Sequence, residues 1–480
     1  MGLAKSAAKG GAVIMVGQVV KILLQLINLV VLARLLGPVE FGLVAMVLSV
    51  YGVGEVLRDF GLSSAAIQAK SISKAQVSNL FWINVLIGII IAIVGYVAAD
   101  WVAVFFGRNE LINIGHMMCL MFIINGISAQ YKAQLNRELK FKEMAIADVV
   151  GVSAGVGSGI ILAWQGYSYW SIVAQFLVQF FIQMLLYIYF GKWLPRLPNR
   201  EVEMSNFFSF GWNLMGAQVL GYFSKSIPSI LIGNKLGAVP LGVFDRAFQI
   251  LMLPLNQLNA PSSSVALPVL SRLNNEDKEK YNNFVLFGQN VMVNIVVLFL
   301  ALAATQTEQL VIEILGEKWI EITPVFRALC GAGAFLALSY ASYWVFVSKG
   351  ITSSLFKFTL VSRPILILIS IAGINWGVEG VAMSYSIGLM INWLLGVFWL
   401  RNTGVPVRRM IMGPLGVVIC YFSASAASYY MMSFFTFNGY ISIIVGWLLL
   451  LIVLCFMYLV IPFFRHSINS LMSIRQYLRK

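Results

Sequence analysis

The chain has 480 residues, of which 60% are hydrophobic and 11% charged, with a formal net charge of +14 and a mean hydropathy of +0.86. This composition excludes a soluble globular protein of this length and predicts a protein that crosses a membrane many times. The four cysteines lie singly in apolar runs, so neither a disulfide framework nor a metal site is indicated.

Fourteen apolar segments are long enough to cross a bilayer as helices, which takes about 20 residues each. The sequence therefore predicts an all-α integral membrane protein with about 14 transmembrane helices. The predicted segments are 12–33, 41–65, 79–104, 111–131, 144–164, 167–190, 208–234, 240–270, 284–305, 322–348, 355–374, 377–400, 411–432 and 440–461.

The basic residues are unevenly divided between the two sides of this topology. Of 33 lysines and arginines, 23 lie in the termini and in the loops on the same side, and only four in the opposite loops. Because basic loops stay in the cytoplasm, both termini are predicted to be cytoplasmic. Topology thus explains the positive charge, and a nucleic-acid partner is excluded. The basic tail is expected to lie on the anionic membrane lipids of the inner leaflet.

A sequence pattern recurs at a constant offset of 200 residues, which predicts a duplicated unit. The matching pairs are Leu36 and Leu236, Gly37 and Gly237, Val39 and Val239, Gly42 and Gly242, Ser63 and Ser263, and Ser64 and Ser264. Such a repeat predicts two pseudo-symmetric six-helix lobes with a substrate site between them, followed by two further helices. The corresponding division is 1–190, a linker at 191–206, 207–400 and 401–480.

Three stretches of this repeat, ARLLGPVEFG, DFGLSSAAIQ and LIGNKLGAVPLG, resemble the bacterial polysaccharide and lipopolysaccharide exporters. These are lipid-linked oligosaccharide flippases of the multidrug/oligosaccharidyl-lipid/polysaccharide transporter superfamily. The resemblance implies a V-shaped alternating-access transporter of the bacterial cytoplasmic membrane that moves an undecaprenyl-pyrophosphate-linked oligosaccharide. It also implies a monomer, with polysaccharide polymerase and export machinery as conceivable partners. Relatives often carry an acidic residue before the LIG of the seventh span, where this chain has Pro228 and Ser229, so a cation-coupling site does not carry over to this lobe.

Six basic residues fall inside predicted spans, where each would cost about 2.5–3.5 kcal/mol at a helix centre and should face protein or water. Lys21 and Lys225 are separated by the repeat plus four residues, one helical turn on the same face. We expect a cationic cavity that binds a pyrophosphate or acidic sugars. Its predicted residues are Lys21, Lys225, Arg246 and Arg363, with Arg58 as a further candidate. The alternative is that these cations pair with Glu55, Asp148 or Asp245.

Polar residues and prolines complete the predicted site. Gln18, Gln25 and Gln218 offer donors and acceptors for sugar hydroxyls, although hydrogen bonds between helices would use the same groups. In the eighth span Pro254, Pro261 and Pro268 recur every seven residues. Each removes a backbone donor, so they predict either a hinge or a static kink.

Two other functional classes remain open in the sequence. A multidrug or organic-cation antiporter of the same superfamily would need buried carboxylates where this chain has lysines. A membrane-embedded glycosyltransferase or ligase would need catalytic residues in an outer loop. There the four glutamates of 306–321 have a spacing that better suits a solvated helical face. No nucleotide-binding, catalytic or cofactor motif is found, so we expect neither an enzyme nor a cofactor.

Overall fold

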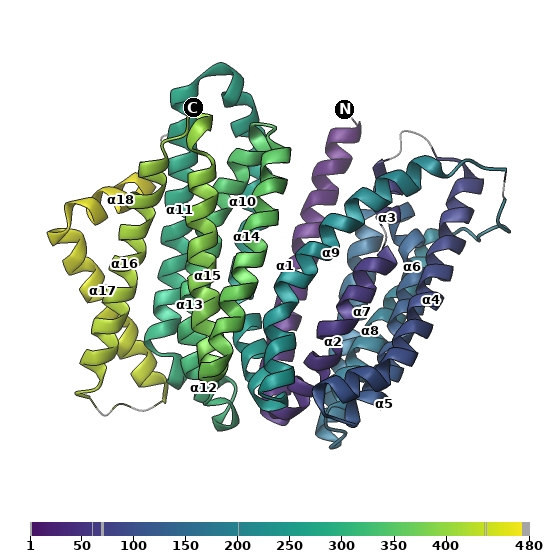
Figure 1. Ribbon diagram of the computed structural model, residues 1–480, viewed down its shortest axis with the longest axis horizontal. Coiled ribbons are helices and arrows are strands. Elements are labelled where there is room, and N and C mark those ends of the chain that lie inside the picture. The colour runs from purple at the N-terminus through teal and green to yellow at the C-terminus, as the bar shows by residue number, and fades with distance from the viewer. Residues whose placement is uncertain are drawn as a thin grey trace. The chain divides into compact units, whose positions relative to one another are not determined.

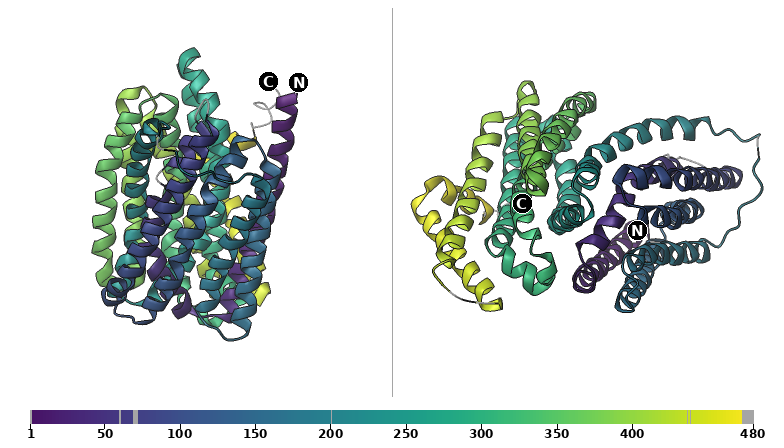
Figure 2. Two further views of the ribbon diagram at one scale, coloured as in Figure 1. Left: turned by 90° about the vertical axis from the view of Figure 1, so that its right-hand side faces the viewer. Right: turned by 60° about the horizontal axis from the view of Figure 1, so that its bottom comes forward.

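The computed structural model describes residues 2–59, 61–68, 72–199, 201–435, 437 and 439–472. Regular structure in these ranges is helical, which confirms the predicted all-α membrane fold. The chain divides into two compact units, Met1–Gly242 and Val243–Lys480. Within each unit the long helices run side by side (Figures 1 and 2).

Unit 1 is built around close helix pairs. α7 packs on α8 and on α1, α4 packs on α6, and α2 packs on α9. Its helices are α1 (Gly2–Leu35), α2 (Pro38–Asp59), α3 (Leu62–Gln68), α4 (Lys74–Phe106), α5 (Glu110–Met118), α6 (Leu120–Arg137), α7 (Phe141–Trp164), α8 (Trp170–Gly191), α9 (Ser205–Lys235) and the first turn of α10 (Ala238–Glu276).

Unit 2 contains the remainder of α10 and the C-terminal helices. α13 packs on α11 and α15, and α16 packs on α11 and α17. The helices are α11 (Lys278–Thr305), α12 (Thr307–Ile314), α13 (Ile322–Ser348), α14 (Thr352–Ala372), α15 (Gly377–Trp399), α16 (Val407–Met432), α17 (Gly439–Val460) and α18 (Pro462–Met472). α18 lies across the ends of α16 and α17 (Figure 1).

Twelve stretches of the described chain are long and apolar enough to cross a membrane. One of these, Thr352–Thr403, holds both α14 and α15, whereas α9 is not among the twelve. The number fourteen therefore stays a prediction. The span predicted at 41–65 corresponds to α2 but ends earlier than predicted, because α2 ends at Asp59 and α3 begins at Leu62, with Gly61 at a φ of 66°. A glycine adopts this left-handed conformation without the steric cost of a Cβ atom.

Local hydrogen bonds fix where several helices begin. Ser73 and Gln76 form a reciprocal capping box at the start of α4, with distances of 3.1 and 2.9 Å. Asp277 caps α11 by accepting hydrogen bonds from the amides of Glu279 and Lys280 at 2.9 and 3.0 Å. The bond from the Lys280 amide is the main reason that the pKa of the Asp277 carboxyl lies below its usual range.

The repeat seen in the sequence recurs in the helix boundaries. α1 ends at Leu35 and α9 at Lys235, while α2 begins at Pro38 and α10 at Ala238, which preserves the offset of 200. The first turns of α2 and α10 also touch reciprocally inside unit 1. A Cβ atom on Gly42 would lie 1.9 Å from the carbonyl oxygen of Ala238, and one on Gly242 would lie 1.9 Å from that of Pro38. Matching positions of the two copies thus contact each other through their backbones.

Candidate functional site

Lys21 is held by a carboxylate from another helix. Its Nζ lies 3.1 Å from Oδ2 of Asp148 on α7, and the two side chains are 25% and 22% exposed. Tyr187 of α8 donates its hydroxyl hydrogen bond to the other oxygen, Oδ1 of Asp148. The Nζ of Lys132 on α6 lies 5.7 Å from the centroid of the Tyr187 ring. The four side chains link four helices of unit 1 through one carboxylate and one phenol.

Arg58 is held by a second carboxylate. Its Nε and Nη2 donate to Oε1 of Glu55 at 3.1 and 2.8 Å, and its Nη1 donates to the carbonyl oxygen of Asn125 at 3.4 Å. The Asn125 amide also donates to Oε1 of Glu55, at 3.2 Å. The other carboxylate oxygen, Oε2 of Glu55, is buried and has no hydrogen-bond partner among the described residues. Burying a hydrogen-bond acceptor without a partner destabilises the folded protein by about 1–3 kcal/mol. A bound hydrogen-bond donor or cation would remove this cost.

A cavity of about 390 Å³ joins the two clusters. Glu55, Arg58 and Asp59 of α2 line it, together with Lys132 of α6 and Tyr187 of α8. Further polar walls come from Ser63, Asn125, Ser128, Asn136 and Gln183. Two carboxylates and two cations in an otherwise apolar helix bundle provide charge partners for an anion or a cation. The amides and hydroxyls offer hydrogen bonds to a polar head group or a sugar.

The other residues that we predicted from the sequence are dispersed. Lys225 is exposed on α9, Gln18 and Gln25 lie on the exposed face of α1, and Gln218 is half-buried on α9. In unit 2, Arg246 is buried and its Nη1 donates to Oε1 of Gln249 at 2.6 Å, whereas Arg363 is half-buried on α14. Of these predicted residues, Arg58 lines the cavity, and Lys21 is linked to it through Asp148 and Tyr187.

The three predicted hinge prolines all lie inside α10, which remains helical through Pro254, Pro261 and Pro268. Ser262 donates to the carbonyl oxygen of Leu258 at 2.6 Å, as serine often does where a helix has lost backbone hydrogen bonds. A hinge role for these prolines remains a prediction.

Sequence reasoning missed Lys132, Tyr187 and Asn125 as parts of a site. Glu55 and Asp148 were considered only as alternative partners for the cations, and the structure makes them partners of Arg58 and Lys21. The available signal was the rarity of carboxylates inside predicted spans, since ionisable residues at such depth are a functional-site hypothesis by default.

We expect Glu55→Gln to lower stability markedly, because it leaves the Arg58 guanidinium, whose side chain is only 9% exposed, without a charge partner. Breaking a fully buried ion pair costs about 3–5 kcal/mol. The partial exposure of Glu55 should reduce this cost to about 2 kcal/mol. The measurement is the apparent Tm of the purified protein in detergent. Glu138→Gln, which breaks the exposed pair with Lys140, is the control and should cost less than about 1 kcal/mol. Equal Tm values for the two variants would contradict the expectation.

Comparison with solved structures finds the same fold in other membrane proteins. The fold is similar to that of the lipid II flippase MurJ in its inward closed conformation, with a TM-score of 0.71 and 15% identity over 93% of this chain and 98% of that one. It is also similar to a multidrug resistance MATE family transporter of the MOP superfamily in its inward-facing conformation, with a TM-score of 0.61 and 15% identity, covering 81% of this chain and 96% of the other.

Curated relatives cover most of the chain. The lipopolysaccharide biosynthesis protein WzxC of Escherichia coli (strain K12) is 24% identical over 83% of this chain and 81% of its own length. The teichuronic acid biosynthesis protein TuaB of Bacillus subtilis (strain 168) is 26% identical over 71% of each chain. The family model described as "Polysaccharide biosynthesis protein" matches residues 31–324, more than half of the chain. The chain therefore belongs to the polysaccharide biosynthesis protein family.

Proposed function

We propose that the protein is a flippase that moves an undecaprenyl-pyrophosphate-linked oligosaccharide across the bacterial cytoplasmic membrane by alternating access, for the synthesis of a surface polysaccharide. The proposal is supported by relatives named for lipopolysaccharide and teichuronic acid biosynthesis and by the likeness to a lipid II flippase fold. The uneven distribution of basic residues supports cytoplasmic termini.

The observation that carries the proposal is the set of basic side chains held by carboxylates inside apolar helices. Lys21 is paired with Asp148 and Arg58 with Glu55, next to a polar cavity. A pyrophosphate offers the same ligand chemistry as a carboxylate, with more oxygens and more charge. When the head group enters, Lys21 and Arg58 would exchange their carboxylate partners for phosphate oxygens. The substrate-bound transporter and the empty transporter would then have different ion pairs. A ligand can shift a conformational equilibrium only if it interacts differently with the two conformations.

Complementation of a flippase-deficient strain tests the proposal. The Lys21→Ala variant is expected to restore less than about a tenth of wild-type export, because a charge-assisted contact to the phosphate is lost. Lys192→Ala is the matched control, since this lysine is exposed and directly follows the end of α8. Membrane abundance of both variants is measured alongside export. Full export by the Lys21→Ala variant would exclude an essential role of this lysine in substrate binding.

A multidrug or organic-cation antiporter is the second candidate. The observation that favours it is the buried Oε2 of Glu55, which lacks a partner among the described residues and lies beside a cavity that also contains Asp59. An antiporter would bind a cation at such a carboxylate. Expression in a drug-sensitive strain separates the two functions. Increased efflux of an organic cation such as ethidium, without rescue of polysaccharide export, would support the antiporter.

A further inference from the structure

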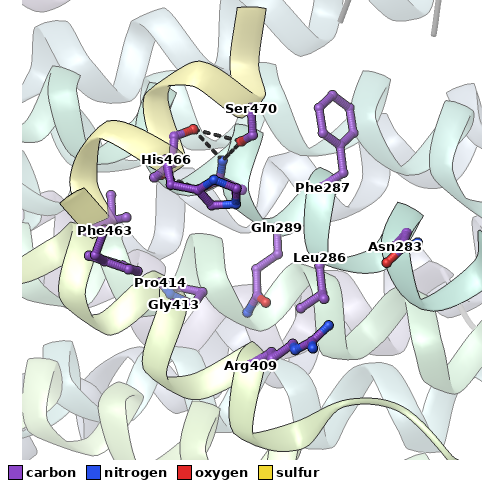
Figure 3. Close-up of a pocket in the computed structure, with 13 residues that line it drawn as sticks. Asn283, Leu286, Phe287, Gln289, Arg409, Gly413, Pro414, Phe463, His466 and Ser470 are labelled. Atoms are coloured by element: carbon purple, nitrogen blue, oxygen red, sulfur yellow. Dashed lines mark hydrogen bonds between the residues drawn. The ribbon is translucent and has the colours of Figure 1, made fainter. Parts of the chain in front are cut away.

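A second cavity, remote in sequence from the site above, lies inside unit 2. It has a volume of about 380 Å³ and is lined by residues of α11, α16 and α18. Figure 3 shows His466 on α18 and Arg409 on α16, with Gln289 of α11 between them in this view. Leu286 and Phe463 are among the apolar residues of its wall.

A network of hydrogen bonds fixes α18 as one wall of this cavity. The amide of Asn290 donates to the carbonyl oxygen of Ser467 at 2.9 Å and to Oγ of Ser470 at 2.6 Å, and the hydroxyl of Ser467 donates back to Oδ1 of Asn290 at 2.6 Å. Asn294 donates to Oγ of Ser467 at 3.0 Å. Phe463 packs against Gly416, where a Cβ atom would lie 2.6 Å from the phenyl ring. These contacts hold α18 in a defined position, so the shape of the cavity is set by the packing of the helices.

The charged groups at the cavity favour an anion. Arg409 and His466 line it, and no carboxylate is among the described residues that do so. Both side chains are exposed, and neither makes an ion pair or a side-chain hydrogen bond with a described residue. The neighbouring Arg408 and Arg465 are exposed too and add to the positive potential. An arginine without a carboxylate partner is well suited to a phosphate.

The side chain of Gln289 favours a ligand that can donate a hydrogen bond. Its side chain is 1% exposed and its Nε2 donates to the carbonyl oxygen of Met410 at 3.2 Å. Gln289 lines the cavity, and its buried Oε1 has no hydrogen-bond partner among the described residues. A ligand with a hydroxyl group beside its phosphate would satisfy this acceptor.

The position of the cavity along the helices matches the depth of lipid head groups. Asn283 lies in the second turn of α11 and Arg409 in the first turn of α16, and α18 directly follows the end of α17. The charge distribution in the sequence assigns this end to the cytoplasmic side. Basic pockets between transmembrane helices on that side bind anionic lipid head groups. The apolar wall of Leu286 and Phe463 suits the first part of the acyl chains.

We propose that this cavity is a binding site for an anionic glycerophospholipid with a hydroxylated head group, namely phosphatidylglycerol. Arg409 and His466 bind the phosphate, Gln289 accepts a hydrogen bond from the glycerol hydroxyl, and the acyl chains run along Phe463. Through α18, the bound lipid stabilises the packing of α16 and α17 against α11. The site is independent of the flippase function proposed above.

The test is binding of phosphatidylglycerol to the full-length protein in phosphatidylcholine nanodiscs, followed by native mass spectrometry. Arg409→Gln combined with His466→Gln is expected to weaken binding by about tenfold. Arg408→Gln is the matched control, because this arginine precedes Arg409 and is exposed but does not line the cavity. It should change binding by less than about twofold. Equal binding by the double variant and the wild type would overturn the proposal, as would equal retention of phosphatidylcholine.

Two competition experiments distinguish phosphatidylglycerol from other phosphate-containing ligands. Soluble glycerol phosphate at millimolar concentration should not displace the lipid, and displacement would indicate a site for a free anion instead. Undecaprenyl pyrophosphate should not compete either, and competition would assign the site to the lipid carrier of the substrate. Gln289→Leu should remove the preference for phosphatidylglycerol over phosphatidic acid, whose head group lacks the glycerol. An unchanged preference would exclude the role of Gln289.

Discussion

Gly42→Ala is expected to prevent the close contact between the first turns of α2 and α10 within unit 1, and to lower both stability and the proposed polysaccharide export. The added Cβ atom would lie 1.9 Å from the carbonyl oxygen of Ala238, whereas contacts under 3.0 Å are essentially never observed. The obstructing atom belongs to the backbone, so no rotamer change can relieve the clash, and the two helices must separate. The expected loss exceeds about 3 kcal/mol, the upper end for an overpacked core. The measurement is the apparent Tm in detergent, together with export in a flippase-deficient strain.

Gly157→Ala is the matched control for this substitution. Gly157 also lies inside a helix, α7, but a Cβ atom there would meet nothing within 4 Å. Because alanine is a better helix former than glycine, this variant should be as stable as the wild type or more stable by up to about 1 kcal/mol. If Gly42→Ala were as stable as Gly157→Ala, the close contact of α2 and α10 would be wrong.

The reciprocity of the contact gives a further expectation for Gly242→Ala. Its Cβ atom would lie 1.9 Å from the carbonyl oxygen of Pro38, the repeat partner of Ala238. We therefore expect nearly the same loss of stability as for Gly42→Ala. The double variant should be destabilised by less than the sum, since either substitution alone already forces the same helices apart. Additive losses would indicate two independent contacts.

The hydrophobic pattern was sufficient to predict most helices, because a run of about 20 apolar residues has no other way to satisfy its backbone in a bilayer. The predicted segment 322–348 coincides with α13, Ile322–Ser348. The break at Gly61 was missed because backbone conformation does not show in hydropathy. The short α12 was missed for the opposite reason, since eight residues with two glutamates give no transmembrane signal.

The sequence predicted which residues would be charged inside the membrane but not how they pair. Arg58 is adjacent to Asp59, yet it binds Glu55, because side chains three residues apart share a helix face and consecutive ones do not. Lys21 binds Asp148, 127 residues further along the chain. Such a partner depends on the packing of α1 against α7, which a single sequence does not reveal. The recurring Gly42 and Gly242 were recognised as a repeat, but their mutual contact was not predicted.

A double-mutant cycle on Lys21 and Asp148 separates a structural role of the lysine from a role in transport. Asp148→Asn leaves the lysine ammonium without its partner and removes the charged acceptor of Tyr187. Lys21→Met leaves the carboxylate with the tyrosine alone. Since both members of the pair are about one quarter exposed, we expect each single substitution to cost about 2 kcal/mol, less than the 3–5 kcal/mol of a fully buried pair. The corresponding substitutions in the exposed pair of Lys140 and Glu138 provide the reference.

The double variant with Lys21→Met and Asp148→Asn distinguishes the structural role of Lys21 from its role in transport. Neither variant side chain carries a charge, so most of the lost stability should return, and the double variant should lose less stability than the sum of the two single losses. Export, however, should stay at least about tenfold below wild type, because the methionine has no charge to offer a pyrophosphate. Recovery of export together with stability would show that Lys21 serves only to hold Asp148. The substrate contact would then have to be sought at Arg58 and Lys132, which line the cavity directly.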